Sequence, residues 1–336
     1  MDASRDTAVE ASAYSTDQII AWLKHIRLPN SYTAYIDDPG SFPKTYESLQ
    51  TVMRCQISRF PYENLSVHYS PTHIVDIRPE VLYEKLMGHN GAKGRGGYCM
   101  ELSIFFHHML RGLGFHVYMT AVRIRPRTDG VPGGEYGGFT HINNIVHLPS
   151  GKRFSVDVGF GGDGPISPLP LDEPGRAIPN IGRQEVRLIQ DYIPRQRFPE
   201  PKLWIYQYRN GPEQEWNSFY SFAEMEFFQD DFEVMNWFTS AKSLHRWTVL
   251  VVRFLRMAED VLFSARSDLP LDQDITITGK VMLVDNAIKV NLGGKTRVVH
   301  TLSSEKDRRQ ALKDYFGISL TDEEARGIIG WDQALS

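Results

Sequence analysis

The sequence is poor in the features that mark several large classes of protein. Two cysteines among 336 residues are too few for a disulfide framework or a cysteine-rich zinc site. No apolar run approaches the length of a membrane span, and the polar start MDASRDTAVEASAYS lacks the apolar segment of a secretory signal. Neither sign of charge dominates, since 41 acidic and 37 basic residues give a net charge of −4. We therefore expect a cytoplasmic protein that has no nucleic-acid or membrane partner.

The length and the pattern of apolar residues predict three regions. A chain of 336 residues is too long for one ordinary core, and a hydrophobic content of 41% supplies large interiors. Helical spacing predominates up to Gly112, strand-like segments begin at Phe115, and the last third mixes strands with a helix. We expect a helical bundle over residues 1–115, a β region over 116–227 and an α/β region over 228–336.

Individual elements follow from the same patterns. Thr16 is predicted to cap a first helix, and further helices are expected over residues 49–56, after Pro79 and over 102–110. The last of these has apolar residues at i, i+3, i+4, i+7 and i+8. Strands are expected at 115–125, 139–148, 153–160, 185–191, 203–209, 216–222, 248–254, 260–266 and 296–302, and a serine-capped helix at 303–316.

The segment GRGGYCMELS, residues 94–103, places Cys99 where a glycine turn meets the start of a helix. A thiol with a free pKa near ~8.5 is mostly protonated at neutral pH, and the unpaired N–H groups of a helix N-terminus favour its thiolate. The glycines also allow close approach by a substrate. We expect Cys99 to be a nucleophile rather than a small buried apolar residue, and Cys55, inside an amphipathic helix, to be structural.

A hairpin further along the chain is predicted to carry the base that a cysteine nucleophile needs. In FTHINNIVHLPSGKRFSVDVGFGG, residues 139–162, the turn LPSG is typical of a three-residue loop with Gly151 in the left-handed conformation. Such a loop pairs Leu148 with Lys152 and so sets the register of both strands.

In that register His141 and Asp157 emerge on one face as diagonal neighbours. A carboxylate in a β-branched strand is costly unless paired, and an imidazole N–H is a natural partner. The predicted constellation is therefore Cys99, His141 and Asp157, and a register slip of one residue would destroy it. The other histidines near these motifs, His107, His108 and His147, are expected to be packing or surface groups.

Competing motifs are weaker. GFGGDG at residues 159–164 is rich in glycine, but no Lys-Ser/Thr pair or helix follows it, so a P-loop is excluded. No HExxH sequence or paired Cys/His spacing indicates a metal site, and we expect none. The adjacent carboxylates Glu323 and Glu324 are expected to lie in an exposed charged segment.

The segments FPYENLSV, RGGYCMELS, THINNIV and VDVGFGG resemble those of the arylamine N-acetyltransferases, and ALKDYFGISL resembles their last helix. The resemblance covers residues 16–320. It implies an α+β fold with a cysteine-protease-like core, made of an N-terminal helical bundle, a central β-barrel and a C-terminal α/β lid. It also implies a Cys-His-Asp triad, which falls on Cys99, His141 and Asp157.

The chemistry that the resemblance implies is a two-step acyl transfer without a metal. Cys99 would take the acyl group from acetyl-CoA or another acyl-CoA, and a small aromatic amine or hydrazine would then remove it. Tyr62 and Phe160 would line the pocket for the aryl acceptor, although both could instead be ordinary core aromatics. The alternative function is a Cys-His-Asp hydrolase, an amidase or peptidase, that uses water as the acceptor.

One segment departs from the family. A Pro-x-Ser-x-Phe stretch usually contacts CoA, whereas this chain has NWFTSAKSLHRW at residues 236–247. The predicted CoA-binding residues there are Lys242, Ser243, His245 and Arg246. Acetyl is expected ahead of malonyl as the acyl group, because an exposed basic cluster more commonly binds phosphates. The alternative is that a cation such as Arg246 binds the carboxylate of a malonyl group.

Overall fold

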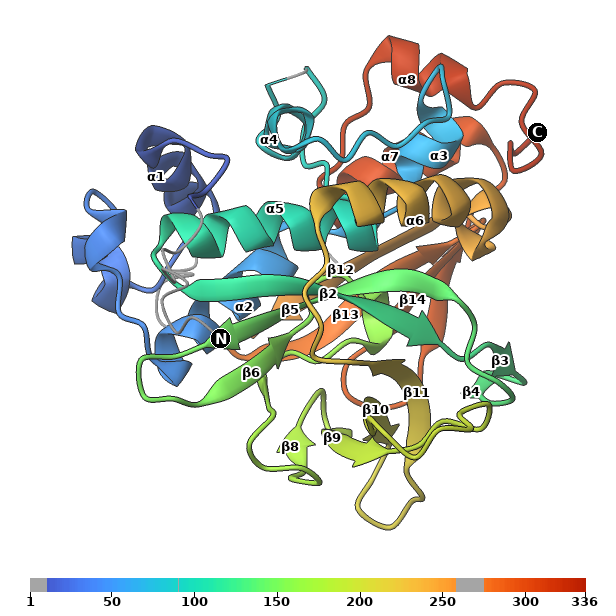
Figure 1. The fold of residues 1–336 in the computed structure, drawn as a ribbon. Coiled ribbons are helices and arrows are strands. Elements are labelled where there is room, and N and C mark those ends of the chain that lie inside the picture. Colours follow the sequence, from blue (N-terminus) through green and yellow to red (C-terminus); the bar gives the residue numbers. More distant parts are fainter. Residues whose placement is uncertain (1–10, 90, 258–274) are drawn as a thin grey trace.

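The computed structural model describes residues 11–89, 91–257 and 275–336, and it has the mixed α and β content expected from the sequence (Figure 1). The helices α1 to α5 precede the eight-stranded sheet, and a second sheet with the helices α6 to α8 follows it. Within the described ranges, no helix combines the length and the apolar character that crossing a membrane requires.

The described part of the N-terminal region forms five α-helices, and the four that were predicted are confirmed. The cap of the first helix was wrongly assigned, because Ser15 rather than Thr16 accepts the N–H of Gln18, whose side chain in turn accepts the N–H of Ser15. The helices are α1 (Thr16–His25), α2 (Tyr46–Arg59), α3 (Leu65–Tyr69), α4 (Pro79–Leu86) and α5 (Cys99–Gly112), with two short 3₁₀ turns at Asn30–Tyr35 and Pro39–Ser41.

The central sheet has eight strands in the order β7-β6-β5-β2-β11-β10-β9-β8, and a two-stranded ribbon, β3–β4, projects from it. The bounds of β9 and β10 are those predicted, whereas β6 ends before Asp157 instead of continuing to Phe160. The strands are β2 (His116–Ile124), β3 (Arg127–Thr128), β4 (Val131–Pro132), β5 (Phe139–His147), β6 (Arg153–Val156), β7 (Leu169–Pro170), β8 (Ile178–Pro179), β9 (Glu185–Asp191), β10 (Leu203–Arg209) and β11 (Asn217–Phe222).

A second sheet has the strand order β1-β12-β13-β14-β15. It links the N-terminal helical region to the C-terminal region, because β1 comes from the helical region and pairs with β12. The predicted strand at 260–266 lies outside the described residues. The hairpin β13–β14 and the helices α6 and α8 were not predicted. The elements are β1 (Tyr62–Glu63), β12 (Leu250–Arg256), β13 (Ile277–Val284), β14 (Ala287–Asn291), β15 (Arg297–Thr301), α6 (Gln229–Lys242), α7 (Glu305–Phe316) and α8 (Asp322–Gly327).

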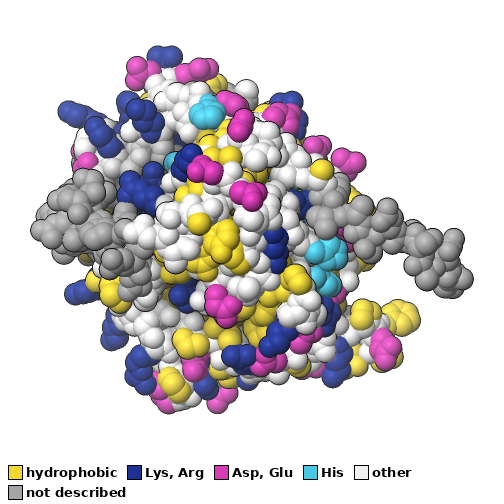
Figure 2. Space-filling model, turned by 90° about the vertical axis from the view of Figure 1, so that its left-hand side faces the viewer, with side chains coloured by type: hydrophobic (Ala, Val, Ile, Leu, Met, Phe, Trp, Pro, Cys, Tyr) yellow, Lys and Arg dark blue, Asp and Glu magenta, His cyan; other side chains and the backbone are white. Residues whose placement is uncertain are grey.

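Helix α5 is the central element of the core. It lies along β2 and β5 and packs against α1 and α4 on its other sides (Figure 1). Phe105 and Phe106 are fully buried, and a side chain of this size contributes about 1.5–3 kcal/mol when removed from water. Cys99, at the start of this helix, is buried as well. On the face of the molecule shown in Figure 2, basic and acidic side chains are interspersed with hydrophobic ones.

Candidate active site

Cys99 is the first residue of α5, as predicted, and its side chain is buried. Glu101 reaches back from the first turn of the helix and accepts the N–H of Tyr98 at 3.0 Å. Gly96 and Gly97, the two glycines before Tyr98, are required by close packing rather than by a left-handed backbone. A Cβ at Gly96 would lie 1.8 Å from the carbonyl oxygen of Pro61, and one at Gly97 would lie 2.5 Å from Cβ of Glu101.

The predicted hairpin register is confirmed. The N–H of Leu148 donates to the carbonyl of Lys152 at 2.9 Å, Gly151 has φ +83°, and Asn144 pairs with Val156. The pairing of Leu148 with Lys152 continues without a slip as far as Asn144 and Val156, where β6 ends. Asp157 follows directly after β6, and its carboxylate reaches the ring of His141 on β5.

His141 and Asp157 form a buried pair. Nε2 of His141 lies 2.7 Å from Oδ2 of Asp157, and the other carboxylate oxygen accepts the N–H of Gly159 at 3.0 Å. Both carboxylate oxygens are therefore engaged, and the ring donates through Nε2. The second ring nitrogen, Nδ1, takes no part in this pair.

The loop after β6 packs the pair of His141 and Asp157 against residues 94–99, the turn that leads into Cys99 and is here called the nucleophile turn. A Cβ at Gly159 would lie 2.9 Å from Cα of Cys99, so only glycine allows the two backbones to approach so closely. On the other side, Sγ of Cys99 lies 3.9 Å from the carbonyl oxygen of Thr140, the residue next to His141. The structure thus brings together Cys99, His141 and Asp157.

The pKa of the Cys99 thiol is raised, whereas the position at a helix N-terminus predicted that it would be lowered. Burial raises the pKa of the Cys99 thiol; the N–H of Met100 opposes this shift, and the charge of Asp157 adds to it. The helix N-terminus acts in the predicted direction, but desolvation outweighs it. The thiol therefore needs a neighbouring base to accept its proton. Burial also raises the pKa of Cys55, to about 11, and its thiol faces the carbonyl of Arg27, 3.9 Å away.

The chain matches, over residues 45–325, a family described as N-acetyltransferase. The chain belongs to the arylamine N-acetyltransferase family. It is 30% identical to the N-malonyltransferase FDB2 of Fusarium pseudograminearum over 335 residues, which cover 94% of this chain and 92% of the relative. It is 26% identical to an arylamine N-acetyltransferase of Mycobacterium tuberculosis over 309 residues, 88% of this chain and 92% of the relative.

Solved structures of the family share the fold of this acyltransferase. The arylamine N-acetyltransferase of Nocardia farcinica aligns with a TM-score of 0.71 at 21% identity, over 98% of this chain and 99% of that one. The enzyme of Mycobacterium marinum, solved in complex with CoA, aligns with a TM-score of 0.69 at 22% identity, over 95% of this chain and 100% of that one. The α+β fold with a cysteine-protease-like core is therefore confirmed.

Aromatic side chains lie around the ring of His141 in this acyltransferase. The ring of Phe160 lies 5.0 Å from that of His141 and packs edge-on against Phe219 at 4.7 Å and Tyr220 at 4.9 Å. The ring of Tyr62 faces Gly161, where a Cβ would lie 3.5 Å from it. Of the two residues predicted to line the acceptor pocket, Phe160 thus belongs to the loop that carries Asp157, and Tyr62 lies beside it.

The side chains of the four predicted CoA-binding residues make different contacts. Lys242 is an exposed residue at the end of α6, and Ser243 caps the short turn Leu244–Arg246 by accepting the N–H of His245 at 3.3 Å. The guanidinium of Arg246 lies 3.9 Å from the ring centre of Trp331. Of the four side chains, His245 is the one that contacts the aromatic residues beside the nucleophile turn: its Nε2 lies 3.2 Å from the hydroxyl of Tyr62.

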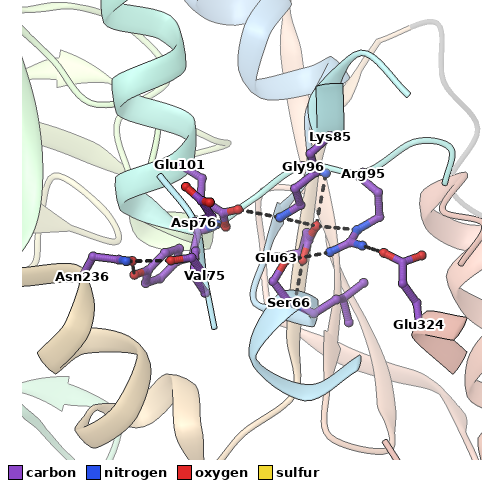
Figure 3. Close-up of polar contacts among 12 residues, drawn as sticks. Glu63, Ser66, Val75, Asp76, Lys85, Arg95, Gly96, Glu101, Asn236 and Glu324 are labelled. Carbon is purple, nitrogen blue, oxygen red and sulfur yellow. Dashed lines mark hydrogen bonds and ion pairs between the residues drawn. The ribbon is translucent and has the colours of Figure 1, made fainter. Parts of the chain in front are cut away.

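A buried ionic network supports the nucleophile turn, and it was missed in the sequence (Figure 3). Glu63 accepts from Nε of Arg95 at 2.9 Å and from the N–H of Gly96 at 3.3 Å, while Lys85 donates to Glu101 at 2.6 Å. Burial alone would raise the pKa of Glu63, but Arg95 and Lys85 together lower it to about 2. The Arg in RGGYC and the Glu two residues after Cys99 were the available signals.

The prediction for Glu324 was wrong. Glu323 is exposed, but Glu324 forms an ion pair with Arg95, and only 16% of its side chain is exposed. Its carboxylate also accepts the N–H of Thr321 at 2.8 Å and so caps α8. The C-terminal helix is thereby tied to the turn before Cys99. Among the described residues, no group of three or more His, Cys, Asp or Glu side chains could hold a metal ion.

Proposed function

We propose that this acyltransferase moves an acyl group from an acyl-CoA to a small aromatic amine or hydrazine through an acyl-Cys99 intermediate. The observation that carries the proposal is the pair of His141 and Asp157, 2.7 Å apart, beside a buried thiol at the start of a helix. Because burial raises the pKa of the Cys99 thiol, the reaction depends on the adjacent imidazole.

In the first half-reaction, Nδ1 of His141 takes the proton of Cys99, and the sulfur attacks the thioester carbonyl. The bond from the carbonyl carbon to the CoA sulfur breaks, and the CoA thiolate leaves with the proton from His141. In the second half-reaction, the amine nitrogen attacks the acyl-cysteine and gives up a proton to His141. That proton then returns to the departing Cys99. Asp157 keeps Nε2 protonated and stabilises the imidazolium.

Exclusion of water decides between transfer and hydrolysis, since water would consume the acyl-cysteine by the same route. Cys99 is 3% exposed, and His141 and Asp157 are each 1% exposed. The half-buried ring of Phe160, supported by the buried rings of Phe219 and Tyr220, is the aromatic side chain beside His141 that a planar acceptor would contact. We place the reaction in the cytoplasm, where a thiol nucleophile stays reduced.

We propose malonyl-CoA as the preferred donor and acetyl-CoA as the second candidate, which reverses the order expected from the sequence. The N-malonyltransferases from Fusarium pseudograminearum and Gibberella moniliformis are 28–30% identical over 94% of the chain. The mycobacterial arylamine N-acetyltransferase is 26% identical over 88%.

Mass spectrometry after incubation with each acyl-CoA tests the proposal. We expect one malonyl group on the peptide that contains Cys99, a smaller acetylated fraction with acetyl-CoA, and loss of either label when an aromatic amine is added. The Cys55→Ala variant is the matched control and should label fully. Absence of an adduct with both donors, or an adduct that persists in Cys99→Ala, would refute the intermediate.

A further inference from the structure

The ring of His245 packs against Tyr98 of the nucleophile turn. It belongs to the turn Leu244–Arg246 after α6, and its ring meets that of Tyr98 edge-on at 5.1 Å. Tyr98 directly precedes Cys99 in the chain. The hydroxyl of Tyr62, 3.2 Å from Nε2, contacts the ring from the side of β1, which pairs with Gly97. His245 is thus held between two residues that flank the turn.

The hydrogen bonds of His245 are incomplete. Its Nδ1 atom is buried and has no hydrogen-bond partner among the described residues. If the hydroxyl of Tyr62 donates to Nε2, both the tyrosine proton and the Nε2 lone pair are satisfied, and the ring proton resides on Nδ1. The opposite tautomer would leave the tyrosine proton without an acceptor as well. The first tautomer therefore leaves fewer groups unsatisfied, and it makes Nδ1–H an unused donor.

This donor is uncharged at neutral pH. Burial lowers the pKa of His245 to about 4, and the charges of His68 and His141 act in the same direction. The cations behind the nucleophile turn are already paired, since Arg95 binds Glu63 and Glu324, and Lys85 binds Glu101. The N–H of His245 is therefore an uncharged, unused donor beside Tyr98 that could receive an anionic part of the substrate.

We infer that Nδ1–H of His245 binds the free carboxylate of a malonyl group carried by the acyl donor and so sets the donor preference. The inference rests on the proposed function and deepens it. Malonyl differs from acetyl by a carboxylate on the methyl carbon. The carboxylate would satisfy the N–H, whereas an acetyl group would leave it unpaired in a buried site.

The test compares kcat/KM for malonyl-CoA and acetyl-CoA in the wild type and in two variants of the full chain. His245→Leu removes the donor and keeps an apolar body, and we expect the malonyl-to-acetyl ratio of kcat/KM to fall by about 10- to 100-fold. In His245→Asn the side-chain amide can replace Nδ1–H, so part of the ratio should return. Arg246→Ala, on the same turn, is the matched control and should change both donors by one factor.

The outcomes separate the inference from the proposed function. Equal losses for both donors in His245→Leu, or no recovery in His245→Asn when both variants retain the thermal midpoint of the wild type, would overturn the inference. A wild type that transfers acetyl and never malonyl would also overturn it and leave acyl transfer intact. A wild type in which neither donor labels Cys99 would instead refute the proposed function.

Discussion

Cys55 in α2 and Cys99 at the start of α5 are both buried thiols, and burial raises the pKa of both. Their neighbours differ. Cys55 faces a backbone carbonyl and the side chain of Arg256, whereas Cys99 lies against the loop that carries the His141–Asp157 pair. Burial therefore opposes ionisation of both thiols, and the helix N-terminus at Cys99 does not outweigh it. We expect the pair of His141 and Asp157 beside Cys99 to make the difference between the two thiols.

The largest effect should come from Asp157→Asn, which would make Cys99 as unreactive as Cys55. The fold should be kept, since an amide can still accept the N–H of Gly159, but His141 would lose the partner that fixes its tautomer. We expect kcat to fall by about 10³–10⁴-fold. Steady-state kinetics with malonyl-CoA and an aniline, together with a thermal melt, would measure it. Turnover near that of the wild type would refute the assignment of Asp157.

Arg95→Ala tests whether the turn must be held rigid. It would leave the fully buried Glu63, and Glu324, without their shared cation, and we expect a loss of about 3–5 kcal/mol in the free energy of unfolding. Urea denaturation would measure the loss. Arg78→Ala removes an exposed arginine paired with Asp76 and is the matched control. Equal shifts in the two variants would show that the buried network adds nothing.

Alkylation compares the two thiols directly. Iodoacetamide at neutral pH should label Cys99 about 10-fold or more faster than Cys55, because only Cys99 has an adjacent base to take its proton. Peptide mapping over a time course gives both rates in one sample. In Asp157→Asn the rate at Cys99 should fall toward that of Cys55. Preferential labelling of Cys55 in the wild type would contradict the comparison.

Acid should weaken the nucleophile turn. The pKa of Glu63 is about 2 in the folded protein and 4.5 in its unperturbed state, so its stabilising contribution is complete above pH 4.5 and is lost as the pH falls toward 2. Glu101, whose pKa is raised by burial, shifts in the opposite direction. Glu63→Gln should therefore flatten the fall in unfolding free energy within this window, as measured by denaturation at several pH values. An unchanged slope would argue against the ionised Glu63.

The smallest effect should come from Cys55→Ala. Removing a buried thiol that has no catalytic neighbour should cost about 1 kcal/mol of stability and leave turnover within about 2-fold of the wild type. The thermal midpoint and kcat/KM measured on one preparation would separate the two. A loss of activity larger than the loss of folded protein would show that α2 contributes to the site.

The sequence by itself determined the features that depend on neighbouring residues along the chain. Apolar spacing located α5, and the turn LPSG set the β5–β6 register, so the pairing of His141 with Asp157 could be predicted from local patterns alone. One local prediction was nevertheless wrong. Ser15 and Thr16 are both good capping residues, and the backbone is extended at Ser15 and already helical at Thr16, so Ser15 is the cap.

Only the tertiary structure decided contacts between residues that lie far apart in the sequence. Arg95 meets Glu324 across 229 positions, and Tyr62 meets His245 across 183. No local periodicity encodes such pairs, because a buried charge or an aromatic residue is stabilised by whichever partner the packed elements bring to it. The same reason explains the raised pKa of the Cys99 thiol. The sequence indicated the helix N-terminus at Cys99, but the burial that outweighs it comes from the packing of the distant loop at Gly159 against the turn.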